Sequence, residues 1–172
     1  MLSYPVRDGV PATIVGEVPP GFRSSERSRD VGDASVFDAM SDAVLTWGLQ
    51  RAARVRLTQA SPRAEVGALV EGTVTKGLAG LVRAQIRCEV VGVVDEPHRR
   101  GFAYGTVEGH VLAGEEAFLV ELVDGRTIVT VRQFSRPARW LARLPGARVV
   151  QRRINARYLD GAELMARELR AS

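Results

Sequence analysis

The C-terminal segment carries a mostly apolar stripe with the repeat of a helix. Nine residues recur there at intervals of three or four positions: Trp140, Leu144, Ala147, Gln151, Ile154, Tyr158, Ala162, Met165 and Leu169. This spacing puts them on one face of an α-helix. We therefore predict a C-terminal helix over residues 135–170, capped by Ser135 and kinked near Pro145, whose apolar face covers a sheet.

The middle of the chain has the pattern of antiparallel strands. Between Arg83 and Val90, polar side chains alternate with apolar ones, which is typical of a strand with one wet and one buried face. Gly92 is the expected position of a bulge, and Asp124-Gly125 is a strong signal for a two-residue hairpin turn. The connections between successive strands are too short for parallel pairing, so we predict an antiparallel meander.

The first part of the chain predicts an irregular arm and then a helix. Prolines and glycines in residues 1–21 leave room only for a short strand at Ala12–Val15, whereas residues 22–31 are compatible with a first strand. Asp33 is a suitable N-cap for a helix that ends near Gly48. Its apolar stripe, expected to face the core, is formed by Phe37, Met40, Val44 and Trp47. We expect one domain: the arm at 1–21, a sheet with one inserted helix at 22–134, and the C-terminal helix at 135–170.

Composition limits the class of protein. The chain has 172 residues, 45% of them hydrophobic, without an apolar run of membrane-spanning length or a recognisable secretory signal. Cys88 is the only cysteine and lies on the buried parity of its strand, so we expect an inert core thiol and a cytoplasmic location. The net charge is +4, but no basic segment with interleaved aromatic residues is present, so nucleic-acid binding is not expected.

The predicted order of elements defines an α+β fold. A strand, a helix, a run of antiparallel strands and a long amphipathic helix require that helix to cover one face of the sheet. This order resembles the helix-grip fold of the START-like and birch-pollen-allergen superfamily, in which a curved antiparallel sheet grips the C-terminal helix. The resemblance implies an apolar space between sheet and helix, a common form of ligand site.

Several sequence motifs resemble those of an uncharacterised family, domain of unknown function nineteen-ninety. The matching segments extend over nearly the whole chain and are YP at residues 4–5, PPGF at 19–22, LTW at 45–47, VVDEPHRRGFAYGTVEGH at 93–110, GEEAF at 114–118 and FSRPARWLARL at 134–144. Because this family has no established activity, the resemblance points to no particular reaction and to no cofactor.

Residues 97–118 hold the densest group of chemically useful side chains. Strand alternation divides residues 101–110 into a smooth face of small residues and a face with aromatic, hydroxyl, carboxylate and imidazole groups. We predict that the second face forms the lip of a pocket. Its polar anchors, gathered near the hairpin mouth at the end of an apolar cavity, are Tyr104, Glu108, His110, Glu115 and Glu116. The candidate ligand-binding residues are Trp47, Phe102, Tyr104, Glu108, His110, Phe118, Trp140 and Tyr158.

Three functions remain open from the sequence. The leading hypothesis is binding of a small, mostly apolar or amphipathic molecule between sheet and helix. A hydrolase or cyclase would use His110 as a general base with Glu115 or Glu116, and Tyr104 as a donor to an oxyanion. A protein-interaction domain would use the arginine-rich helix surface. A purely structural role is the alternative for the hairpin, with its glutamates paired to Arg99 and Arg100; no metal site is expected, because His98 and His110 lack ligand spacing.

Overall fold

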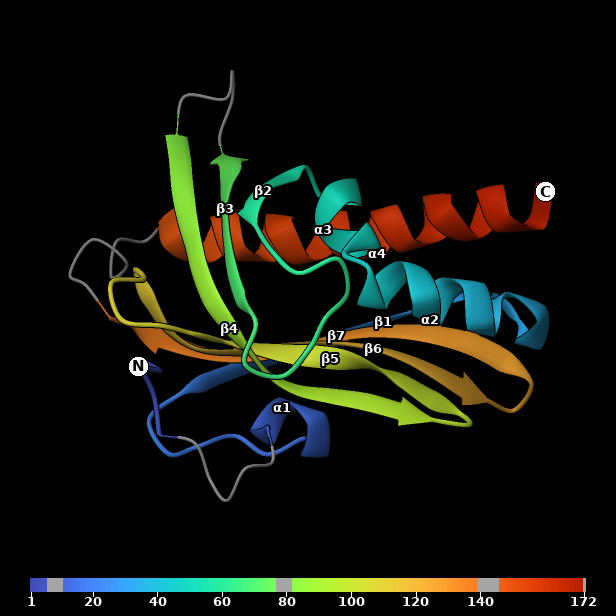
Figure 1. Cartoon of the computed structure of the whole chain (residues 1–172), viewed down its shortest axis with the longest axis horizontal. Helices are drawn as coiled ribbons and strands as arrows, with labels where there is room; N and C mark the ends of the chain where they lie inside the picture. The colour runs from blue at the N-terminus through green and yellow to red at the C-terminus, as the bar shows by residue number, and fades with distance from the viewer. Residues whose placement is uncertain (6–10, 77–81, 139–145, 172) are drawn as a thin grey trace.

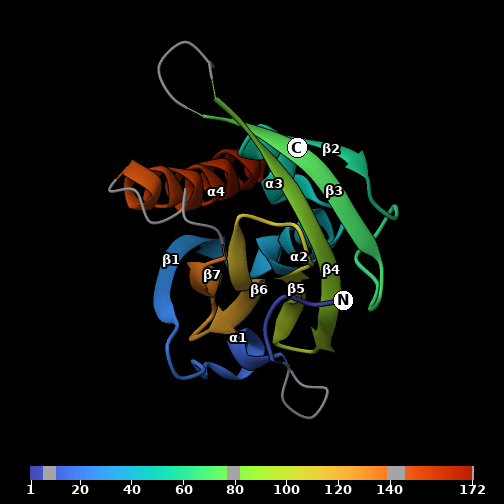
Figure 2. The same cartoon turned by 90° about the vertical axis from the view of Figure 1, so that its left-hand side faces the viewer.

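The computed structural model describes residues 1–5, 11–76, 82–138 and 146–171 and contains a seven-stranded antiparallel sheet. The strand order is β1-β7-β6-β5-β4-β3-β2, so β2 to β7 follow one another across the sheet in sequence order and β1 pairs with β7. The sheet is curved, as Figures 1 and 2 show. The strands are β1 (Arg23–Asp33), β2 (Val55–Gln59), β3 (Leu69–Lys76), β4 (Val82–Glu96), β5 (Arg99–Thr106), β6 (Leu112–Val123) and β7 (Arg126–Pro137).

Helices cover the two faces of the sheet unequally. The long helix α4 (Gly146–Ala171) crosses one face together with α2 (Phe37–Leu45) and α3 (Gly48–Ala52), whereas the short α1 (Ala12–Val15) lies on the other face (Figures 1 and 2). We call these the helix face and the arm face. This arrangement confirms the predicted α+β helix-grip architecture.

Local signals in the sequence set the strand register. Asp124 and Gly125 both have positive φ, 49° and 73°, as the predicted two-residue hairpin turn requires, and Val123 pairs directly with Arg126. The register between β4 and β5 shifts between Val90 and Gly92, which confirms the predicted bulge. These two features determine which side chains of the meander share a face.

The sheet separates two hydrophobic cores. On the helix face, the stripe of α2 and the C-terminal half of α4 pack against β3 to β7; Phe37, Met40, Val44 and Trp47 are all buried, as predicted. On the arm face, Ile14 of α1 packs on Ala103, Ala117 and Leu119. The burial of both faces removes apolar surface from water, which is the main stabilising term.

Two elements differ from the sequence prediction, and one prediction lies beyond the described residues. Ser135 does not cap a helix, because β7 continues to Pro137 by pairing with Arg23 of β1 on one side and Gly114 of β6 on the other. Residues 12–15 form a helical turn on the arm face rather than a strand. The predicted kink near Pro145 lies outside the described residues.

The predicted single inserted helix is two helices. Asp33 accepts a hydrogen bond from the Ser35 backbone N–H at 2.9 Å, as expected for a cap, and a 3₁₀ turn leads into α2. The helix then breaks at Trp47, whose φ is 69°, and a second helix, α3, follows directly. This break lets the Trp47 ring enter the core while its Nε1–H donates to the Ser61 carbonyl oxygen at 2.7 Å.

Among the described residues, no helix is both long and apolar enough to span a membrane.

Candidate functional site

Tyr104 lies on the helix face of the sheet, within a cluster of aromatic rings. Strand pairing puts Phe102 opposite Phe118 and Tyr104 opposite Glu116. The Phe102 and Phe118 rings stack with centroids 5.3 Å apart, and Tyr158 of α4 meets Phe118 edge-on at 4.9 Å. Trp47 completes the cluster against Phe102 at 4.9 Å. Five of the predicted ligand-binding residues are thus brought together: Trp47, Phe102, Tyr104, Phe118 and Tyr158.

A polar pair interrupts this apolar surface. The Tyr104 hydroxyl donates a hydrogen bond to Glu116 Oε2 at 2.9 Å. Burial raises the pKa of Glu116 to about 7, and the bond from Tyr104 only partly opposes this shift. Burial also raises the pKa of both tyrosines well above the usual value. Near neutral pH, Glu116 can therefore accept or release a proton while the tyrosines stay neutral.

Tyr104 and Glu116 belong to a row of polar residues that runs across β5, β6 and β7 to the edge strand β1. Gln133 of β7 lies opposite Glu116, and its side-chain amide donates to the Ser25 hydroxyl of β1 at 3.1 Å. The next row on the same face is apolar, with Val131 beside Phe118 and Phe102. A ligand that lay along the helix face would therefore meet a polar row with apolar side chains next to it on one side.

The described residues of the helix face differ in how deeply they are buried. Phe102, Phe118 and Met40 are fully buried. Glu116 of β6 and Ile86 of β4 are only half-buried, as is Leu57 of the edge strand β2. Figure 1 shows that the first turns of α4 cross the sheet at the end where β3 and β4 extend and where the connection from β5 to β6 lies.

Glu115 lies on the opposite face of the same strand. It is 3% exposed and accepts three hydrogen bonds from the arm: from the Tyr4 hydroxyl at 2.7 Å, from the Thr13 backbone N–H at 2.7 Å and from the Thr13 hydroxyl at 2.5 Å. Gly105 lies opposite Glu115, and the Tyr4 ring packs so closely over it that an added Cβ would lie 2.3 Å from the Tyr4 hydroxyl oxygen. Glu115 thus joins the arm to the sheet.

The predicted gathering of hairpin residues at one mouth is therefore wrong in its geometry. Glu115 and Glu116 point to opposite faces because neighbouring strand residues alternate. His110 lies in the turn after β5, where its Nδ1 accepts a hydrogen bond from the Leu112 backbone N–H at 3.0 Å, and Glu108 is exposed in the same turn. Trp140 lies outside the described residues.

Two other candidate chemistries have little support in this geometry. Burial raises the pKa of the Cys88 thiol, which packs in the helix-face core as predicted and is therefore held in its unreactive protonated form. No group of three His, Cys, Asp or Glu side chains in the described parts of the chain is placed to hold a metal ion.

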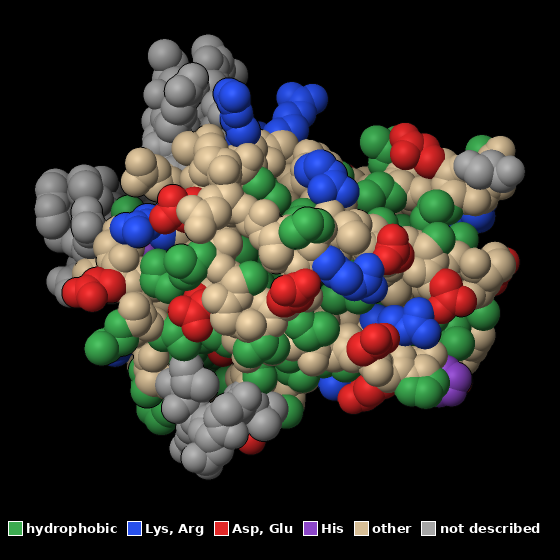
Figure 3. Space-filling model, in the orientation of Figure 1, with side chains coloured by type: hydrophobic (Ala, Val, Ile, Leu, Met, Phe, Trp, Pro, Cys, Tyr) green, Lys and Arg blue, Asp and Glu red, His purple; other side chains and the backbone are tan. Residues whose placement is uncertain are grey.

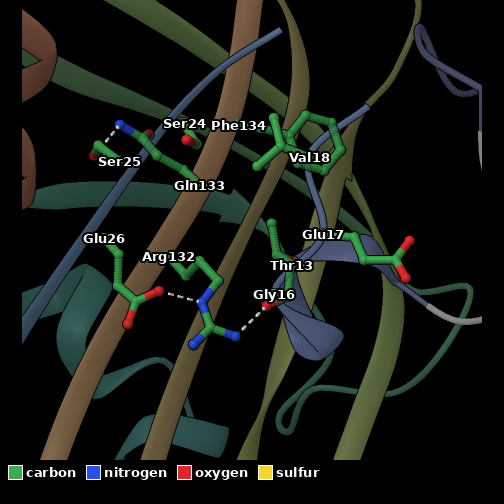
Figure 4. A pocket seen from close by; sticks show the side chains of 10 residues that line it. All are labelled: Thr13, Gly16, Glu17, Val18, Ser24, Ser25, Glu26, Arg132, Gln133 and Phe134. Carbon is green, nitrogen blue, oxygen red and sulfur yellow. Dashed lines mark hydrogen bonds and ion pairs between the residues drawn. The ribbon is translucent and has the colours of Figure 1, made fainter. Parts of the chain in front are cut away.

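A small hollow lies on the arm face between α1, β1 and β7. Its volume is about 90 Å³, and Figure 4 shows the Arg132 side chain within it, between Glu26 and the end of α1. Arg132 donates to Glu26 Oε2 at 2.6 Å and to the Thr13 carbonyl oxygen at 3.0 Å, so the guanidinium is already paired. Pockets for small molecules usually measure about 300–1,000 Å³, so this hollow is a poor candidate for the ligand site.

Sequence reasoning missed Gln133, Tyr4 and Thr13. Gln133 could have been found, because a two-residue turn at Asp124-Gly125 fixes the pairing of β6 with β7 and so places Gln133 opposite Glu116. The contacts of Tyr4 and Thr13 with Glu115 join residues more than 100 positions apart, and no local pattern signals them.

Solved structures with the same fold come from bacteria and plants. The chain aligns with the hypothetical protein jhp0584 from Helicobacter pylori with a TM-score of 0.58 and 15% identity, over 96% of each chain. It aligns with major latex-like protein 151 from Panax ginseng with a TM-score of 0.57 and 14% identity, over 83% of this chain and 97% of that one. Norcoclaurine synthase from Thalictrum flavum, solved with a transition-state analogue, gives a TM-score of 0.58 and 10% identity, over 90% and 99%. At such low identities these likenesses establish the fold alone.

Sequence comparison identifies the family. A UPF0548 protein from Deinococcus radiodurans is 42% identical over 81 residues, which cover 46% of this chain and 38% of that protein. The aligned part is thus well under half of that relative's length. Residues 7–161 match the family described as Domain of unknown function (DUF1990), which confirms the resemblance that the motifs indicated. The chain therefore belongs to the DUF1990 family and has the helix-grip fold of the birch-pollen-allergen and START-like proteins.

Proposed function

We propose that this domain binds a small amphipathic molecule, mostly apolar, between the sheet and α4. The apolar body of the ligand lies along the helix face near Ile86 and Phe118, and its polar end reaches Glu116 and Tyr104. The fold supports this proposal, because a curved sheet that grips a helix is a common setting for an internal ligand site.

The observation that carries the proposal is the environment of Glu116. Its carboxyl group is surrounded by enough protein for its pKa to rise to about 7, yet part of the residue is accessible to solvent. This carboxyl group lies on the helix face beside Tyr104, where a ligand held between the sheet and α4 would meet it. A packed apolar core would be more stable without a carboxyl group at this position, so a binding role gives a reason for its presence.

The division of the helix face into a polar row and apolar rows favours an amphipathic ligand. Phe102, Phe118 and Val131 lie along one side of the row, and such side chains would bury a hydrocarbon body at about 25 cal/mol per Å² of apolar surface removed from water. The polar row then fixes the orientation of the ligand, because a buried polar group without a partner is costly.

The test is a binding screen with a variant that narrows the site. Fatty acids, sterols, flavonoids and alkylamines are screened by thermal shift, and hits are titrated by calorimetry. Replacement of the half-buried Ile86 by tryptophan should weaken binding of a hit by about tenfold or more through steric overlap.

The matched control is Val123→Trp, an equally large change at a position that is 50% exposed beside the β6–β7 turn. This variant should bind the hit within about twofold of the unaltered protein. Failure of every compound class to bind, or equal binding by the two variants, would contradict the proposed site.

A further inference from the structure

We propose that the polar end of the ligand is a basic amine, which forms an ion pair with the Glu116 carboxylate beside the Tyr104 and Phe118 rings. This inference rests on the proposed function and names the chemical class that the site selects. It follows from three observations on the described residues. Among them, Glu116 has no ion-pair partner, aromatic rings surround it, and its neighbours carry no charge near neutral pH.

Glu116 differs from the ion-paired acidic residues of the described chain because its partner is neutral, and from Glu115 because it accepts one hydrogen bond rather than three. The protein has 24 lysine and arginine residues for 20 aspartate and glutamate residues, and basic and acidic side chains lie interspersed on its surface (Figure 3). Within the described residues, no arginine or lysine forms an ion pair with Glu116, whose hydrogen-bond partner is the neutral Tyr104. The contrasting pairs include Glu26–Arg132, Asp30–Arg126, Glu121–Arg99 and Glu163–Arg29.

A cation from outside would supply the missing partner. Burial makes the charged form of a lone carboxylate costly, and an opposite charge at contact distance offsets that cost strongly where water is scarce. An ammonium group also donates up to three hydrogen bonds, which suits a carboxylate with one donor in place. A neutral hydroxyl would leave the carboxylate charge uncompensated.

The aromatic rings around Glu116 favour the same ligand. Tyr104 and Phe118 lie 5.4 Å apart between ring centroids, and Tyr158 meets Phe118 from α4. Aromatic rings attract cations through the negative charge of their faces. The site thus combines one negative group with rings that tolerate a positive charge and contact an apolar body.

The described side chains that face Glu116 do not titrate near neutral pH. They are Tyr104 on β5, Tyr158 on α4, Cys88 on β4 and the uncharged Gln133 on β7; the pKa of each tyrosine and of the thiol is raised above its ordinary value. Glu116 itself loses its proton as the pH rises through about 7. Binding of an amine should therefore strengthen between about pH 6 and pH 8, where the amine keeps its charge and the carboxyl group loses its proton.

The experiment compares three probes with the same hydrocarbon chain: octylamine, 1-octanol and octanoate. Each is titrated into the protein and into Glu116→Gln at about pH 8 and about pH 6. We expect octylamine to bind the protein at least about tenfold more tightly than either other probe at the higher pH, and to lose that advantage in Glu116→Gln. Glutamine keeps the size of the side chain and removes its charge, so octanol affinity should stay within about threefold.

Distinct results separate this inference from the proposed function. Equal binding of octylamine and octanol, tighter binding of octanoate, or an octylamine advantage that survives in Glu116→Gln would overturn the amine proposal while an apolar site remained. The amine proposal would also be overturned if none of the three probes bound while a neutral compound from the screen did bind and Ile86→Trp weakened that binding. Tyr104→Phe is the second variant: it keeps the carboxylate, so it should retain a preference for octylamine.

Discussion

Glu115 and Glu116 are neighbours in β6, yet they face opposite layers and have opposite surroundings. Glu115 accepts three hydrogen bonds from Tyr4 and Thr13, donors that the chain itself supplies. Glu116 accepts one, from Tyr104, and is only half-buried. The arm face is therefore completed by the folded chain, whereas the helix face keeps a polar group whose requirements the described residues only partly meet.

The difference shows how one sheet can separate stability from binding. A buried carboxylate that is fully hydrogen-bonded ties distant segments together and fixes their arrangement. A partly satisfied carboxyl group in an apolar wall lowers stability in its ionised form, and such perturbed groups are common at functional sites. Strand alternation places both kinds at successive positions of one strand.

The largest expected effect is from Glu115→Ala. The change would leave three buried donors on Tyr4 and Thr13 without an acceptor, and unsatisfied buried groups cost about 1–3 kcal/mol each. We expect a loss of about 4 kcal/mol in the free energy of unfolding, measured by urea denaturation.

The matched variant on the helix face is Glu116→Ala, which should cost less than about 1.5 kcal/mol at low pH, where Glu116 is protonated, because it leaves only the Tyr104 hydroxyl without its acceptor. If the two alanine variants lost equal stability, Glu115 would have no special part in holding the arm to the sheet.

The next predicted effect is a gain in the free energy of unfolding rather than a loss, and it depends on pH. The pKa of Glu116 is raised from 4.5 to about 7 in the folded protein, so this group favours the folded state most below pH 4.5, and that contribution is lost as the pH rises through about 7. Glu116→Gln has no such loss. It should be more stable than the unaltered protein by up to about 3 kcal/mol above pH 8, with the difference vanishing near pH 4.5.

Denaturant unfolding of both proteins across this pH range measures the difference, and Glu71→Gln, a change on the exposed surface of β3, is the control. A stability difference between Glu116→Gln and the unaltered protein that is the same at every pH would show that burial does not raise the pKa of Glu116.

The sequence predicted this comparison in part. The Asp124-Gly125 turn and the alternation of β6 were enough to place Glu116 with Phe118, and the stripe that ends at Leu169 indicated the helix that covers them. These signals are local, because a turn fixes register and a period identifies a face.

The arm face could not be predicted in the same way. Its irregular segment has no period, and Tyr4 finds Glu115 only after the sheet has formed. The end of β7 was missed for a related reason: the Ser135-Arg136-Pro137 sequence has the local pattern of a helix start, but pairing with β1 and β6 extends the strand. Long-range pairing therefore overrides local preference at these positions.

The smallest expected effect tests the single hydrogen bond on the helix face. Tyr104→Phe removes the bond that lowers the pKa of Glu116, so the pKa of that carboxyl group should rise further above 7, which an NMR titration of the side chain would detect. The stability cost should be about 1 kcal/mol at low pH, where Glu116 is protonated. Tyr4→Phe removes the corresponding hydroxyl from Glu115 and should cost more, about 2 kcal/mol, because Glu115 is fully enclosed. A larger loss for Tyr104→Phe than for Tyr4→Phe would reverse the comparison and make the helix-face pair the structural one.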